Sequence, residues 1–202
     1  MPETTDYGRI YDALYAKGYN NHPQGWGVKV GMLPWMVEHL DFETVLDVGC
    51  GRGQDVKFLL DAGKNAHGVD ASGEAVNIAC REVDSTRFSD RDLTDDVRWG
   101  GIRFDAVVSS DVLEHLEEAD VPAAVERIVA AANRYVGLRT AAFETKSGER
   151  CGFGSEVIHP TRKPSEWWFD RVSEAAAAQG RTATKIKDGR GWFVALLSER
   201  TA

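Results

Sequence analysis

The chain has 202 residues, a length that suits one α/β domain with a single sizeable core. Its 32 acidic residues outnumber its 24 basic ones, and the net charge of −8 argues against nucleic acid or an anionic membrane as partner. The cysteines Cys50, Cys80 and Cys151 are odd in number and widely spaced, which suits neither a disulfide framework nor a zinc site.

The sequence gives no reason to expect a targeting signal. The N-terminus is polar and rich in tyrosine, without the charged and then apolar order of a secretory signal. No apolar run approaches the length of a membrane span. We therefore expect a cytoplasmic protein with no membrane partner, and the sequence leaves its oligomeric state open.

Apolar runs alternate with amphipathic helical patterns along the chain, the order that builds a parallel sheet with helices on both faces. Strands are expected at 44–48, 65–69, 85–89, 104–109, 134–139, 182–187 and 192–198. Helices are expected at 26–40, 54–62, 73–83, 118–132 and 165–179. The last two strands are separated by a segment that begins Asp188-Gly189, a good turn signal, and should form a hairpin. All of residues 1–202 are expected in one domain.

The segment 45–54 carries the most specific motif. Its sequence, VLDVGCGRGQ, is a buried strand that runs into a glycine-rich turn and a helix, which brings backbone N–H groups close to a ligand. The dinucleotide-binding turn is G-x-G-x-x-G, but here Gly53 comes one position early and Gln54 fills the expected place, which weakens a nicotinamide hypothesis. The segment resembles the first motif of class I S-adenosylmethionine (SAM)-dependent methyltransferases, hydrophobic-D-x-G-x-G-x-G.

An acidic residue stands at the end of the next strand. Asp70 follows the glycines by about twenty positions, where a carboxylate can accept both ribose hydroxyls of a nucleoside. The alternative is that Asp70 only caps the helix that begins near Gly73. Together with the glycine motif, the position favours the ribose role.

The resemblance implies a cofactor site and a fold. It places the glycine turn around the methionine moiety, Asp70 on the ribose, and Asp92 with Leu93 near the adenine. The expected cofactor-binding residues are Asp47, Gly49, Cys50, Gly51, Gly53, Asp70, Ala71, Asp92, Leu93 and Ser110. For the adenine contact a solvated charged turn is the alternative, with competing carboxylates at Asp90, Asp95 and Asp96. The implied fold is a doubly wound, seven-stranded, mostly parallel sheet that ends in an antiparallel C-terminal hairpin.

The fourth strand continues into a second family signature. The sequence FDAVVSS at 104–110 leads to Asp111 and then to LEHL at 113–116, a run that is also typical of these methyltransferases. It should lie at the carboxyl ends of the strands, where α/β folds bind ligands. Two interpretations of His115 stay open: a residue that packs and hydrogen-bonds beneath the cofactor, and a catalytic base.

The same run offers potential metal ligands. Asp111, Glu114 and His115, joined by His159, resemble the set that holds a divalent metal in small-RNA 2′-O-methyltransferases and in some quinone-biosynthesis O-methyltransferases. Such an ion would lower the pKa of a hydroxyl nucleophile. The chain departs from that pattern, because Asp111 replaces the usual Glu and the second histidine motif of the RNA enzymes is missing. We therefore expect a metal-independent site and keep the metal set as an alternative.

Two segments fall outside the α/β repeat, and long connections of this kind are often functional. Residues 1–25 are expected to form an N-terminal lid or substrate segment, and 140–164 a substrate loop, as is common in the resembled family. In the loop, His159 is a candidate to orient the acceptor oxygen or accept its proton, and a surface histidine is the alternative. Tyr11 and Tyr15, four residues apart, could cover the sulfonium, line the acceptor pocket, or simply pack as an amphipathic helix.

The two tryptophans that open the last helix should point in different directions, because adjacent helical residues lie about a hundred degrees apart. Trp168 falls in a core-facing stripe with Val172 and Ala175. Trp167 is then free to face the pocket mouth or a partner.

The function expected from these features is SAM-dependent methylation of a small polar metabolite, on oxygen first and nitrogen second. The main rival is metal-dependent 2′-O-methylation of RNA or methylation of a catechol-like hydroxyl. A rival of another class is a non-catalytic SAM- or nucleoside-binding protein, and a nicotinamide dehydrogenase ranks third.

Overall fold

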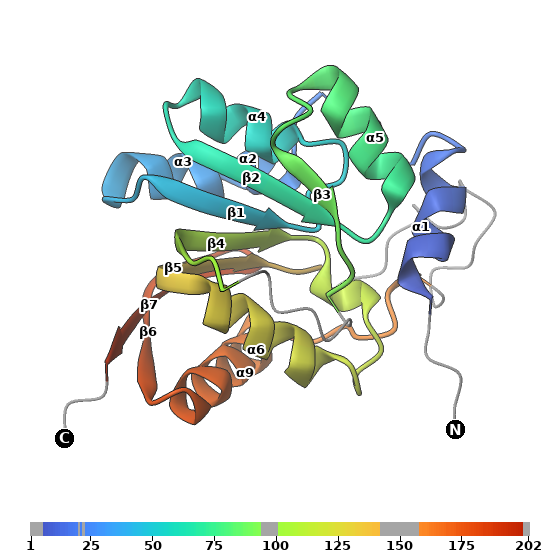
Figure 1. The fold of residues 1–202 in the computed structure, drawn as a ribbon. Coiled ribbons are helices and arrows are strands. Elements are labelled where there is room, and N and C mark those ends of the chain that lie inside the picture. The colour runs from blue at the N-terminus through green and yellow to red at the C-terminus, as the bar shows by residue number, and fades with distance from the viewer. Residues whose placement is uncertain (1–5, 20, 22, 94–100, 142–157, 200–202) are drawn as a thin grey trace.

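The computed structural model describes residues 6–19, 21, 23–93, 101–141 and 158–199. These residues form a seven-stranded sheet in the order β3-β2-β1-β4-β5-β7-β6 (Figure 1). The strands are β1 (Thr44–Val48), β2 (Asn65–Asp70), β3 (Phe88–Asp90), β4 (Phe104–Ser110), β5 (Ala132–Arg139), β6 (Arg181–Gly189) and β7 (Trp192–Glu199). Strands β1 to β5 pair in parallel, and β7 runs antiparallel to β5 and β6. The predicted sheet and its C-terminal hairpin are confirmed.

Helices cover both faces of this sheet (Figure 1). On one face lie α2 (Trp26–Lys29), α3 (Met32–His39), α4 (Gln54–Asp61) and α5 (Gly73–Glu82). On the other lie α6 (Val121–Ala131) and α9 (Ser165–Ala178). Helix α1 (Tyr7–Tyr15) packs against α5 at the carboxyl ends of the strands, and the 3-10 turn η1 (Leu113–His115) follows β4.

The core is double-sided, as expected of a parallel sheet with both faces covered. In β1, Leu46 and Val48 pack with the layer of α6 and α9, whereas Val45 packs with that of α3 and α4. This explains why the strand is an almost continuous apolar run. Among the described residues, no helix has the length and apolar character that crossing a membrane requires.

The helix predicted at 26–40 is wrong as one element, since Gly31 separates α2 from α3 with a φ of 84°. A positive φ cannot continue a right-handed helix. The strand predicted at 85–89 begins only at Phe88. The Asp84 carboxylate accepts from the backbone N–H of Thr86 at 2.9 Å, and this turn occupies the preceding residues.

Other ends differ by a few residues. Helix α6 begins at Val121 rather than 118, with Pro122 in its first turn, where proline is favoured. Strand β5 begins directly after it at Ala132, two residues earlier than expected. Of the predicted substrate loop, residues 142–157 lie outside the described residues.

Candidate active site

A cleft opens at the carboxyl ends of the parallel strands, where the chain order reverses between β1 and β4 and α/β folds bind ligands. Its walls come from the N-terminal segment and from the connections that follow β1, β2, β3 and β4. Of the predicted cofactor residues, six line it: Gly49, Ala71, Leu93, Asp70, Asp92 and Ser110. Four others belong to the strand and turn beside the cleft, outside its lining: Asp47, Cys50, Gly51 and Gly53.

The glycine turn joins β1 to α4, and its backbone requires a glycine at position 49. This residue has a φ of 76°, and a β-carbon there would lie 2.2 Å from a methyl group of Val112. The backbone N–H groups of Gly49 and Cys50 both donate to the carbonyl of Val69, at 2.8 and 3.0 Å. The turn therefore folds back onto β2 and leaves Gly49 at the cleft surface.

Asp70, the last residue of β2, connects this turn to the next one. Its carboxylate accepts from the N–H of Gly51 at 2.8 Å and from the N–H of Ser72 at 2.9 Å. Burial raises the pKa of Asp70 to about 6. The alternative that Asp70 caps the following helix is wrong, because Ser72 is the N-cap of α5 and its hydroxyl accepts from Ala75.

Two further carboxylates lie close to the turn. Asp47 is 2% exposed, and burial, reinforced by the charges of Asp55 and Asp70, raises its pKa well above the usual value. Asp55 accepts from the N–H groups of Gly27 at 2.8 Å and Val28 at 3.2 Å, and so caps α2. Burial raises the pKa of Asp55 to about 6. Asp55 was not among the predicted residues, because its only signal in the sequence is a carboxylate in the first turn of α4.

The residues predicted to lie near the adenine follow β3. Asp92 and Leu93 line it together with Arg91, whose N–H donates to the carbonyl of Asp70 at 2.8 Å. Asp90 is exposed and outside the lining. The competing residues Asp95 and Asp96 lie outside the described residues.

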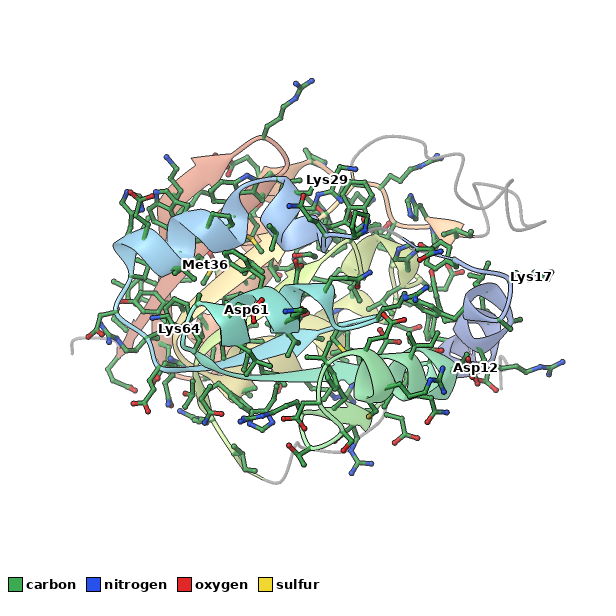
Figure 2. The ribbon with its side chains drawn as sticks, turned by 90° about the horizontal axis from the view of Figure 1, so that it is seen from above. Asp12, Lys17, Lys29, Met36, Asp61 and Lys64 are labelled. Carbon is green, nitrogen blue, oxygen red and sulfur yellow. The ribbon has the colours of Figure 1, made fainter. Side chains whose placement is uncertain are left out.

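Five aromatic side chains from α1, from α2 and from the connection between them also line the cleft, and they are Tyr7, Tyr11, Tyr15, Tyr19 and Trp26. Helix α1 is attached at two places. The Tyr7 hydroxyl donates to Asp120 and accepts from the N–H of Glu117, both at 2.8 Å. Asp12, which lies on the α5 side of α1 in Figure 2, accepts from the Ser72 hydroxyl at 2.7 Å. Tyr11 and Tyr15 are thus placed at the cleft.

Asp111 lines the cleft directly after β4. It is the only non-glycine residue with a positive φ (55°) in the described part of the chain. Its carboxylate forms a salt bridge with Arg139, the last residue of β5, and the side chain of Arg139 is buried while that of Asp111 is partly buried. The Arg139 guanidinium also lies 5.0 Å from the centre of the Trp26 ring. Arg139, which was not among the predicted residues, therefore contacts two cleft residues while lying outside the lining itself.

Asp111 does not join the other three residues of the predicted metal set. Glu114, His115 and His159 come together, with one potential ligand atom of each lying within 4.8 Å of the others. The imidazole centres are 4.4 Å apart. Of the three, only His115 lines the cleft, where its ring lies 5.3 Å from that of Tyr11.

Both imidazoles are neutral near pH 7. Burial, with the proximity of His159, lowers the pKa of His115 to about 3. Burial, with the charges of Arg162 and Arg139, lowers the pKa of His159 to about 4. His159 is 5% exposed, so its interpretation as a surface histidine is wrong.

Of the two adjacent tryptophans of α9, only Trp168 lies where it was predicted. Trp168 is fully buried with Val172 and Ala175, which confirms the core stripe. Trp167 is partly buried between Lys163 and Arg171, whose charges lie 5.3 and 4.9 Å from its ring centre. It does not line the cleft.

Comparison with known proteins agrees with this geometry. Residues 45–134 match the family model for the methyltransferase domain. The matched segment is a little less than half of the chain. A cypemycin N-terminal methyltransferase from Streptomyces sp is 32% identical over 94 residues, or 43% of this chain and 38% of that protein. This chain therefore matches well under half of that relative's length.

Solved methyltransferase structures resemble the whole chain. Magnesium protoporphyrin IX methyltransferase from Synechocystis PCC 6803 with bound SAM has a TM-score of 0.65 and 16% identity. The match covers 99% of this chain and 100% of that one. A TehB-like SAM-dependent methyltransferase from Corynebacterium glutamicum has a TM-score of 0.58 and 18% identity, covering 96% and 97% of the two chains. The fold is therefore that of class I SAM-dependent methyltransferases.

Proposed function

We propose that this domain binds SAM and transfers its methyl group to a small polar acceptor. The observation that carries the proposal is the placement of Asp70 and Gly49 together in one cleft, beside Asp92 and Leu93. A carboxylate, a close backbone approach and an apolar platform are what a nucleoside with an amino-acid tail requires. Magnesium protoporphyrin IX methyltransferase has been crystallised with SAM and with its demethylated product, which supports the same use of the fold.

The acceptor should enter from the aromatic side, where Tyr11, Tyr15 and Asp111 line the cleft. A small acceptor suits a confined cleft walled by α1, and the net charge of −8 argues against RNA. Methyl transfer from a sulfonium is an in-line displacement, so alignment in a dry site supplies most of the catalysis.

Oxygen is the proposed target atom and nitrogen the second choice. A neutral His159, whose ring centre lies 4.4 Å from that of His115 on the cleft wall, suits a group that orients a hydroxyl acceptor. Its pKa of about 4 makes it a weak base, and the even lower pKa of His115 suits packing better than base catalysis. Nitrogen keeps support from the cypemycin N-terminal methyltransferase, and a carbon methyltransferase also shares the fold. The cytoplasmic location stays a prediction.

Calorimetric titration with SAM, S-adenosylhomocysteine and NAD tests the cofactor directly. We expect binding of the first two and none of NAD; NAD binding alone would overturn the proposal. Asp70→Ala should weaken SAM binding at least tenfold, because charge-assisted bonds to two hydroxyls are worth about 1.5–3 kcal/mol each. The matched control is Asp90→Ala. Asp90 lies beside Asp70 in the register of β3 against β2, but it is exposed and does not line the cleft.

Incubation with methyl-deuterated SAM and a panel of hydroxylated and aminated metabolites tests catalysis. Mass spectrometry of the products identifies the acceptor and its methylated atom. SAM binding without formation of S-adenosylhomocysteine with any acceptor would favour the non-catalytic alternative.

A further inference from the structure

We propose that Glu114, His115 and His159 bind one divalent transition-metal ion beside the cleft. All three residues are buried, and one oxygen and two imidazole nitrogens converge within 4.8 Å of one another. Binding of the ion does not depend on the proposed methyl transfer, whereas any role of the ion in catalysis does.

The contacts around the cluster orient these atoms as metal ligands are oriented. The Nδ1 atom of His115 lies 2.5 Å from the carbonyl oxygen of Ile158, so Nδ1–H donates and Nε2 is left as the free ligand. The Oε1 atom of Glu114 accepts from the N–H of Ala141 at 2.8 Å, which leaves Oε2 free. Metal-bound histidines typically donate their other N–H to a carbonyl or carboxylate, and ligating carboxylates are hydrogen-bonded in turn.

The free atoms also need a partner. Glu114 Oε2 and His159 Nδ1 are buried and have no hydrogen-bond partner among the residues that the structure describes. A buried polar atom left unpaired costs about 1–3 kcal/mol. Two such atoms in one small cluster are explained together if a cation lies between them.

The donor set selects the kind of ion. Two imidazole nitrogens and one carboxylate oxygen suit Zn²⁺, Co²⁺ or Fe²⁺, whereas Mg²⁺ and Ca²⁺ prefer oxygen ligands. Asp111 would add a second carboxylate but is committed to Arg139. Three protein ligands leave coordination positions open, as in catalytic rather than structural zinc sites. A bound ion would act as a Lewis acid toward an acceptor oxygen, since His115 is on the cleft wall.

Titration of tag-free, metal-stripped protein with Co²⁺ tests the proposal through its visible absorption. We expect one bound ion with nitrogen ligands, competition by Zn²⁺ and none by Mg²⁺. Glu114→Gln and His159→Ala should each weaken binding at least a hundredfold. The control His39→Ala, which alters an exposed histidine of α3, should bind as the wild type does.

S-adenosylhomocysteine affinity, measured on each variant, shows whether the cofactor side of the fold is intact and separates this proposal from the proposed function. X-ray absorption of the Zn²⁺-loaded wild type should show two imidazoles and needs no variant. The proposal is overturned if the wild type binds no Co²⁺ in stoichiometric amount, or if absorption shows fewer than two imidazoles. It is equally overturned if folded Glu114→Gln and His159→Ala proteins bind as tightly as the wild type.

Discussion

The Asp70 carboxylate should make SAM affinity fall in acid, and Asp70→Asn should remove that dependence. An ionised carboxylate offers about four lone-pair sites. The N–H of Gly51 occupies one on Oδ2, and the N–H of Ser72 occupies one on Oδ1. About one site per oxygen is left, enough for two ribose hydroxyls. Protonation converts one acceptor into a donor and breaks this match.

The size of the effect follows from the pKa of about 6 that burial imposes on Asp70. Between about pH 8 and pH 5 the ionised fraction falls roughly tenfold, so SAM should bind about tenfold more weakly, or ~1.4 kcal/mol. The effect on folding has the opposite sign. Because the folded-state pKa is raised, Asp70 stabilises the fold in acid, and that stability is lost as pH rises through about 6. Unfolding driven by Asp70 therefore cannot imitate the loss of binding.

Calorimetry with SAM across this pH range, on wild type, Asp70→Asn and the control Asp90→Asn, measures the slope. The wild type and the control should share it, and Asp70→Asn should bind at least tenfold more weakly at about pH 8 with a flatter profile. A slope that persists in Asp70→Asn belongs to other groups, of which Asp55 has a pKa of about 6. Equal affinities and slopes in all three proteins would refute the ribose role.

Three more substitutions test other parts of the site. Gly49→Ala places a β-carbon 2.2 Å from Val112 at a φ of 76°, so calorimetry should find SAM affinity reduced at least tenfold; normal binding would contradict the need for glycine. Arg139→Met leaves the partly buried Asp111 unpaired and should lower the free energy of unfolding in urea by about 3–5 kcal/mol, whereas a loss below about 1 kcal/mol would show a weak pair. His159→Ala should lower turnover of the identified acceptor roughly ten- to a thousandfold at nearly unchanged SAM affinity. Full turnover by that variant would make His159 structural.

Local patterns were enough to predict most of the sheet and several residues that line the cleft. The glycine turn that follows β1 can be recognised from a few residues, and so can Asp70. The helical spacing of Trp168 and Val172 identifies the core face of α9. One helix was predicted at 26–40, where the structure has two. A single glycine inside a helical pattern does not indicate that its φ will be positive.

The contacts that hold the aromatic wall of the cleft and Asp111 in place could not be predicted in the same way. The hydrogen bond from Tyr7 to Asp120 joins residues 113 positions apart. The pairing of Arg139 with Asp111 requires that the carboxyl ends of the neighbouring strands β4 and β5 lie side by side. Neither residue type indicates its partner in the sequence. Such contacts are properties of packing between distant elements.

The short turn after β4 also binds residues from two later parts of the chain. The side chain of Glu114 accepts from the N–H of Ala141, and the backbone carbonyl of Glu114 accepts from the N–H of Thr161. The ring of His115 donates to the carbonyl of Ile158. Ala141, Ile158 and Thr161 are therefore all hydrogen-bonded to this one turn. Doubling the length of a loop with fixed ends costs only about 0.6 kcal/mol. We expect that the stretch between Ala141 and Ile158 can be replaced as a cassette, giving new acceptor preferences on an unchanged SAM-binding body.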